Sequence, residues 1–170
     1  PADIGLNKAS CIIGKCNLAY GTLWESVEEK FEFKQNRSFN IVIICVDNAK
    51  FRHDYYKIAY HNGSVYNKNL YTIDCGNGKN FGQVILTDAQ KTLKNPFEIF
   101  PDMLDQDTAE TQGIDGCSYR ESLEKQDLFI NDLLAVEAVQ ILWKLFREDE
   151  IDINGIIYNG TKSKMLPIKQ

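Results

Sequence analysis

The run Phe39–Val46 constrains the fold most strongly, because it is almost entirely apolar and is followed at once by Asp47 and Asn48. A continuous apolar run of this length predicts a strand that is buried on both faces of a sheet. We expect helices on either side of it in the sequence, at Asn7–Tyr20 and Asn48–Tyr60. Helix–strand–helix order is typical of a parallel α/β sheet.

The chain after residue 62 follows a different pattern, in which a hairpin replaces the helix–strand units. Leu70–Cys75 and Phe81–Thr87 are rich in β-forming residues and are joined by a Gly-Asn-Gly-Lys-Asn turn, so they predict a hairpin. We also expect one short strand around Trp24–Phe33. Residues 88–116 form a long acidic stretch without a predicted element, and connections of this length are usually functional or disordered.

A long helix is predicted over Gln126–Arg147, with Asp127 near its positive end and basic residues near its negative end. Apolar residues nearly encircle it, which indicates a helix that is buried or is covered by a partner subunit. Gly155–Asn159 and Met165–Ile168 predict a final hairpin.

The length of 170 residues suits one domain with a sizeable core. No apolar run approaches the roughly 20 residues of a membrane span, and no signal-peptide pattern is present. We therefore expect a cytoplasmic protein without a membrane partner. The first residues are neither basic nor apolar and include no initiator Met, so we expect the chain to be the interior of a longer reading frame.

The five cysteines form no CxxC pair and no Cys/His metal spacing, which argues against a zinc site and favours a reducing compartment. One of them, Cys45, falls inside the predicted strand. The net charge of −5 is unevenly placed, because the acidic side chains concentrate after residue 95. No basic stripe with interleaved aromatic residues is present, so we expect no nucleic-acid partner.

Asp47 and Asn48 sit where the predicted strand emerges from the sheet. Ligands of parallel α/β sheets gather at the carboxyl ends of the strands. The following helix would begin beside these residues, with unpaired N–H groups and its positive dipole end. Two interpretations follow: one of the two residues caps the helix, or the pair serves metal or phosphate chemistry.

Several stretches, in this order, resemble the ThiF/MoeB/HesA superfamily, whose members are relatives of ubiquitin-activating enzymes. Asp47–Arg52 fits the D-N-x-x-x-R pattern, and ADIGLNKA is similar to the D-x-G-x-x-K-A segment that opens a helix in these proteins. The hairpin GNGKNFGQVIL resembles the family's next strand pair, and the stretch from Cys117 to Phe146 resembles its crossover loop and long helix. The closest resemblance is to ThiF-family proteins of the plasmid-associated PRTRC gene cluster, and it covers nearly the whole chain.

The resemblance implies an α/β fold with a Rossmann-like mixed sheet, parallel in its first part and extended by antiparallel strands, in a single domain that lacks its N-terminal portion. Residues 1–62 would complete the nucleotide-binding half, 63–87 the hairpin, 88–125 the crossover loop, and 126–170 the long helix and terminal hairpin. It also implies a homodimer that uses ATP to adenylate the C-terminal carboxylate of a small ubiquitin-like or sulfur-carrier protein.

Each candidate site residue matches a position in the family's motifs. Asp47 matches the aspartate that binds Mg²⁺, a hard cation that prefers oxygen ligands. Lys8 matches a lysine that contacts phosphate, and its alternative is a solvated helix lysine. Arg52 matches the motif arginine, or it holds the helix in place through a carboxylate. Asn48 is expected to cap the helix and to contact the nucleotide. Cys117 is a candidate for a covalent bond to the carrier, or an ordinary surface thiol beside an acidic loop.

The family's glycine-rich phosphate loop, its ribose-binding acid and its N-x-x-R-Q arginine would all precede ADIG, outside this chain. We therefore expect the chain by itself to bind nucleotide poorly. The paired CxxC motifs that hold zinc in many relatives are missing too. Two alternatives stay open: a non-catalytic scaffold of the same fold that works through protein partners, and a fragment of a Rossmann-type dehydrogenase. The D-N-x-x-x-R pattern and the hairpin argue against the dehydrogenase.

Overall fold

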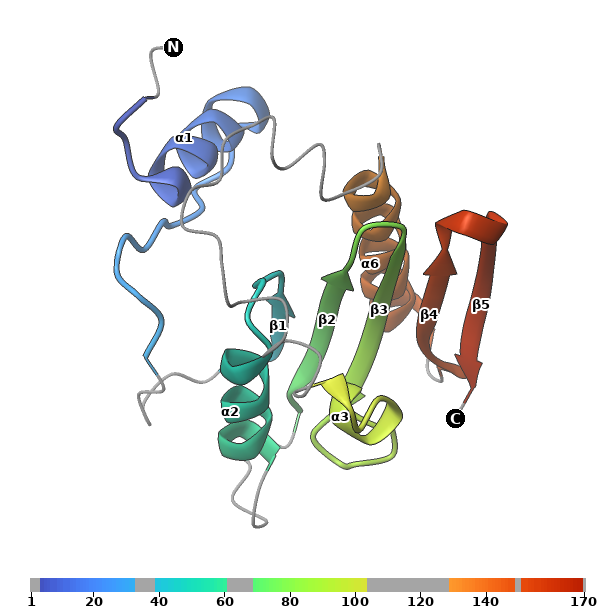
Figure 1. Cartoon of the computed structure of the whole chain (residues 1–170). Helices are drawn as coiled ribbons and strands as arrows, with labels where there is room; N and C mark the ends of the chain where they lie inside the picture. The colour runs from blue at the N-terminus through green and yellow to red at the C-terminus, as the bar shows by residue number, and fades with distance from the viewer. Residues whose placement is uncertain (1–3, 33–38, 61–68, 104–128, 149–150, 170) are drawn as a thin grey trace. The chain divides into compact units, whose positions relative to one another are not determined.

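A computed structural model of the chain describes residues 4–32, 39–60, 69–103, 129–148 and 151–169 (Figure 1). The contacts within the chain divide it into two compact units, Pro1–Lys34 and Gln35–Gln170. The single domain expected from the sequence stays a prediction. Within the described ranges, no helix is long and apolar enough to cross a lipid bilayer.

The first unit is built around helix α1 (Lys8–Tyr20). The side-chain oxygen of Asn7 caps its start by accepting a hydrogen bond from the backbone N–H of Ala9 at 2.9 Å. Gly21 ends the helix in the left-handed conformation, at φ 65°, which glycine adopts without steric cost. The predicted helix is confirmed.

The short strand expected around Trp24–Phe33 does not form over residues 24–32. The side chain of Asn17 instead holds both backbone groups of Trp24, donating to its carbonyl and accepting from its N–H, each at 2.9 Å. A strand would need these same groups for its neighbour. This local bonding therefore takes the place of strand pairing.

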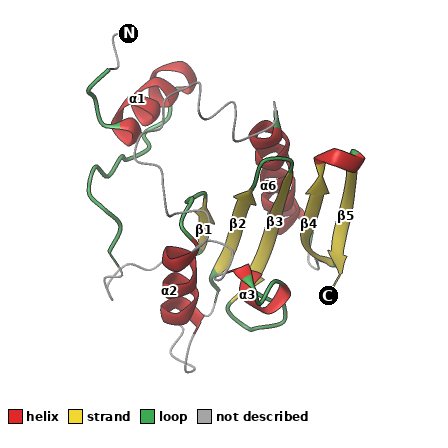
Figure 2. Ribbon diagram, viewed as in Figure 1, coloured by secondary structure: helices red, strands yellow, loops and turns green. Residues whose placement is uncertain are grey.

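The second unit contains a five-stranded mixed sheet in the order β1-β2-β3-β4-β5 (Figure 2). β1 runs parallel to β2, and the other neighbouring pairs are antiparallel. The strands are β1 (Ile41–Ile44), β2 (Tyr71–Asn77), β3 (Phe81–Asp88), β4 (Ile153–Asn159) and β5 (Lys164–Lys169). Both predicted hairpins are confirmed, and the unit is of the α/β class, with antiparallel strands extending a parallel pair.

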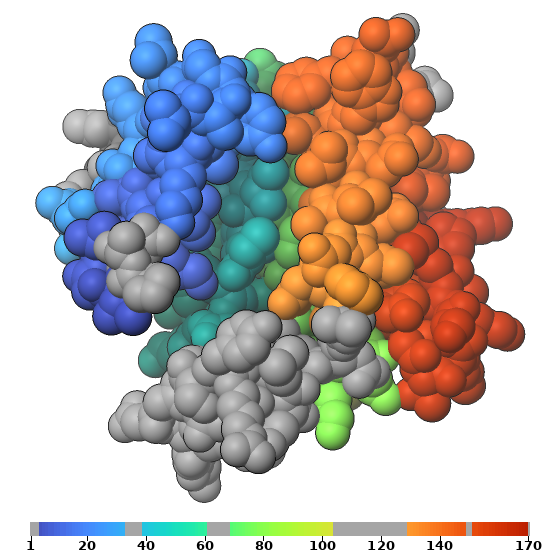
Figure 3. Space-filling view, turned by 90° about the horizontal axis from the view of Figure 1, so that it is seen from above, coloured from blue at the N-terminus to red at the C-terminus, as the bar shows by residue number. Residues whose placement is uncertain are grey.

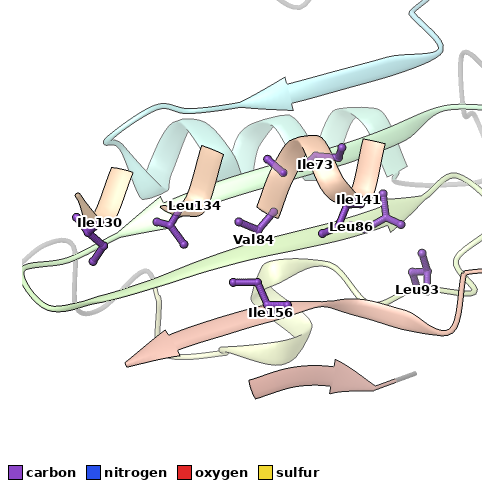
Figure 4. Packing of buried hydrophobic residues seen from close by; sticks show 9 residues of the cluster. Ile73, Val84, Leu86, Leu93, Ile130, Leu134, Ile141 and Ile156 are labelled. Carbon is purple, nitrogen blue, oxygen red and sulfur yellow. The ribbon is translucent and has the colours of Figure 1, made fainter. Parts of the chain in front are cut away.

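Helices α2 (Ala49–Tyr60) and α6 (Ile130–Arg147) cover opposite faces of this sheet (Figure 1). Ile73 of β2 lies in the aliphatic cluster of α6, which Figure 4 shows from close by. Its neighbour Thr72 bonds instead to the hydroxyl of Tyr55 on α2. Because successive residues of a strand point to opposite faces, the two contacts place the two helices on the two sides of β2.

The core between α6 and the sheet is aliphatic. Its buried members are Ile73, Val84, Leu86, Leu93, Ile130, Leu134, Ala138, Ile141 and Ile156 (Figure 4). The helix approaches β3 closely at Gly82, where an added Cβ would lie 2.5 Å from a methyl carbon of Leu134. A side chain at this position would therefore have to displace the side chain of Leu134.

The expectation that α6 is buried nearly all round is wrong, because only one face of the helix packs on the sheet. Its outer face is apolar and exposed, with 59–69% of each residue accessible at Val136, Val139, Trp143 and Phe146. In Figure 3 the orange atoms of α6 lie at the surface of the second unit, beside the red atoms of β4 and β5. The alternative, cover by a partner subunit, stays a prediction.

Strand β1 is shorter and less buried than the sequence suggests. It spans four residues, and Ile44 is 4% exposed whereas Ile43 is 47% exposed. Burial on both faces was a wrong prediction, because α6 covers β2 and β3 and leaves the same face of β1 open. Cys45, expected inside the strand, follows its end and is exposed.

The start of the long acidic stretch is ordered by a short helix, α3 (Pro96–Ile99). Asn95 and Glu98 form a capping box, in which each side chain bonds the backbone N–H of the other. Buried Asn154 ties the preceding segment to the sheet, accepting from the N–H of Lys94 at 2.9 Å. Residues 104–116 of the predicted irregular stretch lie outside the described residues.

Candidate functional site

Asp47 lies in the turn between β1 and α2, at the carboxyl edge of the parallel pair of strands. Asp47 is exposed to solvent. Buried Ile44 and buried Ala49 anchor the chain on either side of the turn. The site therefore presents a carboxylate to solvent from a backbone that is fixed at both ends.

Asn48 caps the start of α2, as predicted. Its side-chain oxygen accepts a hydrogen bond from the N–H of Phe51 at 2.7 Å, and its carbonyl accepts one from the N–H of Arg52 at 3.2 Å. Capping satisfies one of the N–H groups that a helix start leaves unpaired. Contact between Asn48 and a nucleotide stays a prediction.

Arg52 is buried, with 7% of the residue exposed, and its guanidinium joins three segments. It donates to the Asp74 carboxylate at 2.7 Å and to the carbonyl of Cys75 at 2.8 Å, both on β2. Both Nε and Nη2 also donate to the carbonyl of Val46, next to Asp47. The sequence left two roles open for Arg52. These contacts agree with the second role, in which Arg52 holds the helix in place through a carboxylate.

Asp74 was not singled out from the sequence, although it is the acid that Arg52 binds. Its side chain has no solvent exposure. Burial raises the pKa of Asp74 to about 6, while the charge of Arg52 and the nearby Tyr56 hydroxyl lower it. Its second oxygen and that hydroxyl are both buried without a well-aligned hydrogen bond. One feature of the sequence could have indicated Asp74: Thr72 and Asp74 place two polar side chains on the same face of an otherwise apolar strand.

Gly76 makes room for this arrangement. A Cβ at this position would lie 2.6 Å from Nη1 of Arg52, closer than ordinary side-chain contacts allow. Gly76 is the first glycine of the hairpin sequence GNGKN. The guanidinium beside it leaves no room for a side chain at this position.

Tyrosines on α2 complete the buried polar layer. The hydroxyls of Tyr55 and Tyr60 both contact the hydroxyl of Thr72, at 2.9 and 2.5 Å, and the rings of Tyr56 and Tyr60 are stacked. Burial raises the pKa of Tyr55 to about 12 and those of Tyr56 and Tyr60 well above their usual value. These groups therefore act as neutral hydroxyls that fix α2 against β2.

Cys45 and Cys75 are neighbours on adjacent chain segments, one position beyond the paired residues Ile44 and Asp74. The neighbouring Cys75 thiol lowers the pKa of Cys45 to about 7, with a further contribution from Arg52 and against the effect of burial. The Cys45 thiol, together with burial, raises the pKa of Cys75. Neither thiol was considered for the site in the sequence.

The two remaining candidates lie outside this cluster. Lys8 is exposed in the first turn of α1, in the first unit, which is described by itself. Cys117 lies outside the described residues. The structure thus brings together Asp47, Asn48 and Arg52, and the roles expected of Lys8 and Cys117 stay predictions.

The fit of Mg²⁺ to the site depends on the single carboxylate of Asp47. In the described part of the chain, no group of three or more Asp, Glu, His or Cys residues could hold a metal. Mg²⁺ is usually bound by one or two carboxylates together with waters and substrate phosphates. An exposed carboxylate at a strand end therefore fits an ion that arrives with a nucleotide.

A cavity of about 270 Å³ lies at the opposite edge of the sheet, lined by residues of α2, β3 and α3. Asp88 in its wall already accepts hydrogen bonds from Thr92 and Leu93, both at 2.8 Å. Glu98 in turn belongs to the capping box of α3. The acidic groups of this cavity are thus engaged in holding the fold.

Comparison with known protein families and with curated protein sequences gave no match to this chain.

Proposed function

We propose that this chain is part of an ATP-dependent adenylyltransferase that activates the C-terminal carboxylate of a small ubiquitin-like or sulfur-carrier protein. The observation that carries the proposal is the placement of Asp47. Its carboxylate is exposed at the carboxyl end of β1, and Arg52 and Asn48 fix the turn that bears it. Ligands of α/β sheets bind at this edge.

The reaction joins a carboxylate to the α-phosphorus of ATP. An oxygen of the carrier's carboxylate forms the new bond, the bond from the α-phosphorus to the bridging oxygen breaks, and pyrophosphate leaves with an acyl-adenylate as product. Asp47 would hold a Mg²⁺ ion, whose positive charge would offset the charge that builds on the phosphate oxygens. Asp47 contributes an oxygen ligand whose position is set before the nucleotide arrives.

The other residues have separate parts in the proposal. Arg52 is a positioning residue, since its guanidinium is engaged by Asp74 and by the carbonyl of Val46. Lys8 would contact the phosphates. Cys117 would form a covalent bond with the activated carrier, so Cys117→Ala should abolish any carrier–enzyme adduct while adenylation continues.

The exposed outer face of α6 favours a second candidate function, a non-catalytic scaffold of the same fold. Val139 and Trp143 on this face are about three-fifths exposed. Apolar side chains that gather on one surface mark protein contacts. A scaffold would work through this face, and a homodimer would use it as well.

Carrier-dependent exchange between ATP and pyrophosphate tests the proposal. The product of the complete reading frame is measured with candidate carriers, beside its Asp47→Asn and Asp54→Asn variants. Asp54 is the matched control, because it is a half-exposed aspartate on α2, beyond the turn. We expect exchange in the wild type and in Asp54→Asn, and its loss in Asp47→Asn.

Absence of exchange with every candidate carrier, in a folded protein, would overturn the enzyme proposal and would support the scaffold. In that case Val139→Lys should abolish self-association or partner binding in sedimentation experiments, whereas Asp47→Asn should leave it unchanged.

A further inference from the structure

Cys45 and Cys75 occupy neighbouring positions at the carboxyl edge of β1 and β2. Ile44 pairs with Asp74 in the parallel register, so the two cysteines come next on the two chains. Adjacent strands lie about 4.8 Å apart, within the range of about 4.4–6.8 Å that Cα atoms joined by a disulfide span. These two positions continue the register of the strands, so their side chains point to the same face of the sheet. The geometry of the pair suits a direct bond.

The two thiols differ in their access to solvent. Cys45 is exposed and follows the last residue of β1. Cys75 is half-buried within β2 and packs against the aliphatic cluster under α6. A reagent in solution reaches Cys45 first, and Cys75 lies where it can attack the product.

We propose that Cys45 and Cys75 form a reversible dithiol–disulfide site that reacts with low-molecular-weight disulfides such as oxidised glutathione. In the first step the deprotonated Sγ of Cys45 attacks one sulfur of the reagent. A bond between Cys45 and glutathione forms, the S–S bond of the reagent breaks, and one glutathione leaves as a thiolate that takes up the released proton.

In the second step Sγ of Cys75 loses its proton and attacks Sγ of Cys45. The protein disulfide forms, the bond to glutathione breaks, and the second glutathione leaves with the proton. The two cysteines have then lost two electrons, and the reagent has been reduced to two thiols. A reducing thiol reverses both steps.

The site adjoins the contacts of Arg52. The carbonyl of Cys75 accepts a hydrogen bond from this guanidinium at 2.8 Å. The carbonyl of Val46, the residue after Cys45, accepts one from Nε of Arg52 at 3.1 Å. Oxidation would therefore join the end of β1 to β2, two segments that Arg52 already holds, two residues before Asp47. A change in adenylation rate on oxidation rests on the proposed function, whereas the formation of the disulfide does not.

The test treats the reduced product of the complete reading frame with oxidised glutathione, blocks the remaining thiols by alkylation, and maps the peptides by mass spectrometry. We expect a linked peptide pair that contains Cys45 and Cys75 and that is lost after reduction. The Cys75→Ser variant should stop at the first step and accumulate glutathione on Cys45. A Cys11→Ser control should form the same linked pair as the wild type.

Three results would overturn the proposal: glutathione that stays on Cys45 in the wild type, a link from Cys45 to a different cysteine, or full alkylation of both thiols after oxidation. The wild-type map decides between these outcomes without any variant. It also stands apart from the exchange assay, so a protein that forms the disulfide but shows no exchange contradicts only the proposed function.

Discussion

Arg52 and Asp74 form a buried ion pair that joins α2 to β2, with 2.7 Å between Nη1 and Oδ1. The carboxylate has no solvent exposure, and the same guanidinium reaches the carbonyls of Val46 and Cys75. The ion pair therefore lies directly beneath the turn that carries Asp47. It links the stability of the sheet edge to the placement of the candidate metal ligand.

Removal of the cation should destabilise the protein strongly. Arg52→Met leaves the Asp74 carboxylate buried without a partner, which costs about 3–5 kcal/mol of the free energy of unfolding. Denaturation in urea near neutral pH measures this loss. Lys50→Met, at an exposed position on the same helix, is the control and should change the free energy by less than about 0.5 kcal/mol.

The double variant Arg52→Met/Asp74→Leu separates the ion pair from the packing of the side chains. It removes the stranded charge, so it should recover most of the stability that Arg52→Met loses. A double variant as unstable as the sum of its two single variants would contradict the account of the ion pair.

The pH dependence of stability should carry the signature of Asp74. Its folded-state pKa of about 6 lies above its ordinary value of 3.8, so the folded state favours the protonated carboxyl. The resulting stabilisation is fully present below about pH 4 and is lost as the pH rises through about 6. The stability of the wild type relative to Asp74→Asn should therefore fall by about 3 kcal/mol across this interval.

Unfolding curves of both proteins at several values between pH 4 and 7 measure this difference. A relative stability that rises with pH would show that the attraction of Arg52 outweighs the burial of the carboxylate.

Gly76→Ala should displace Arg52. The added methyl group would meet Nη1 at 2.6 Å, and overpacking of this kind typically costs about 1–3 kcal/mol. Gly14→Ala is the matched control, because nothing lies within 4 Å of a Cβ at that position in α1. A helix interior gains about 0.5–1 kcal/mol from alanine, so thermal unfolding should show shifts of opposite sign.

The sequence predicts the elements whose signals are local. The Gly-Asn-Gly-Lys-Asn turn between two β-rich runs predicts the hairpin of β2 and β3, and Asn7 and Gly21 mark both ends of α1. These signals lie within a few residues of one another.

The predictions that failed depend on contacts made outside the predicted segment itself. The Trp24 strand is absent because the side chain of Asn17 takes the backbone groups that pairing would need. The exposure of Ile43 depends on where α6 packs, which the apolar run of β1 does not indicate. The sequence does not single out Asp74, because its partner Arg52 lies 22 residues away along the chain.

The Mg²⁺ dependence of carrier-stimulated ATP–pyrophosphate exchange tests the central claim most directly. It is measured on the complete reading-frame product at saturating ATP, with the Asp47→Asn and Asp54→Asn variants beside the wild type. The account predicts that Asp47→Asn lowers the exchange rate by roughly 10- to 100-fold, with partial recovery at high Mg²⁺, while Asp54→Asn follows the wild type. An Asp47→Asn variant with the wild-type rate and the same Mg²⁺ dependence would contradict the account.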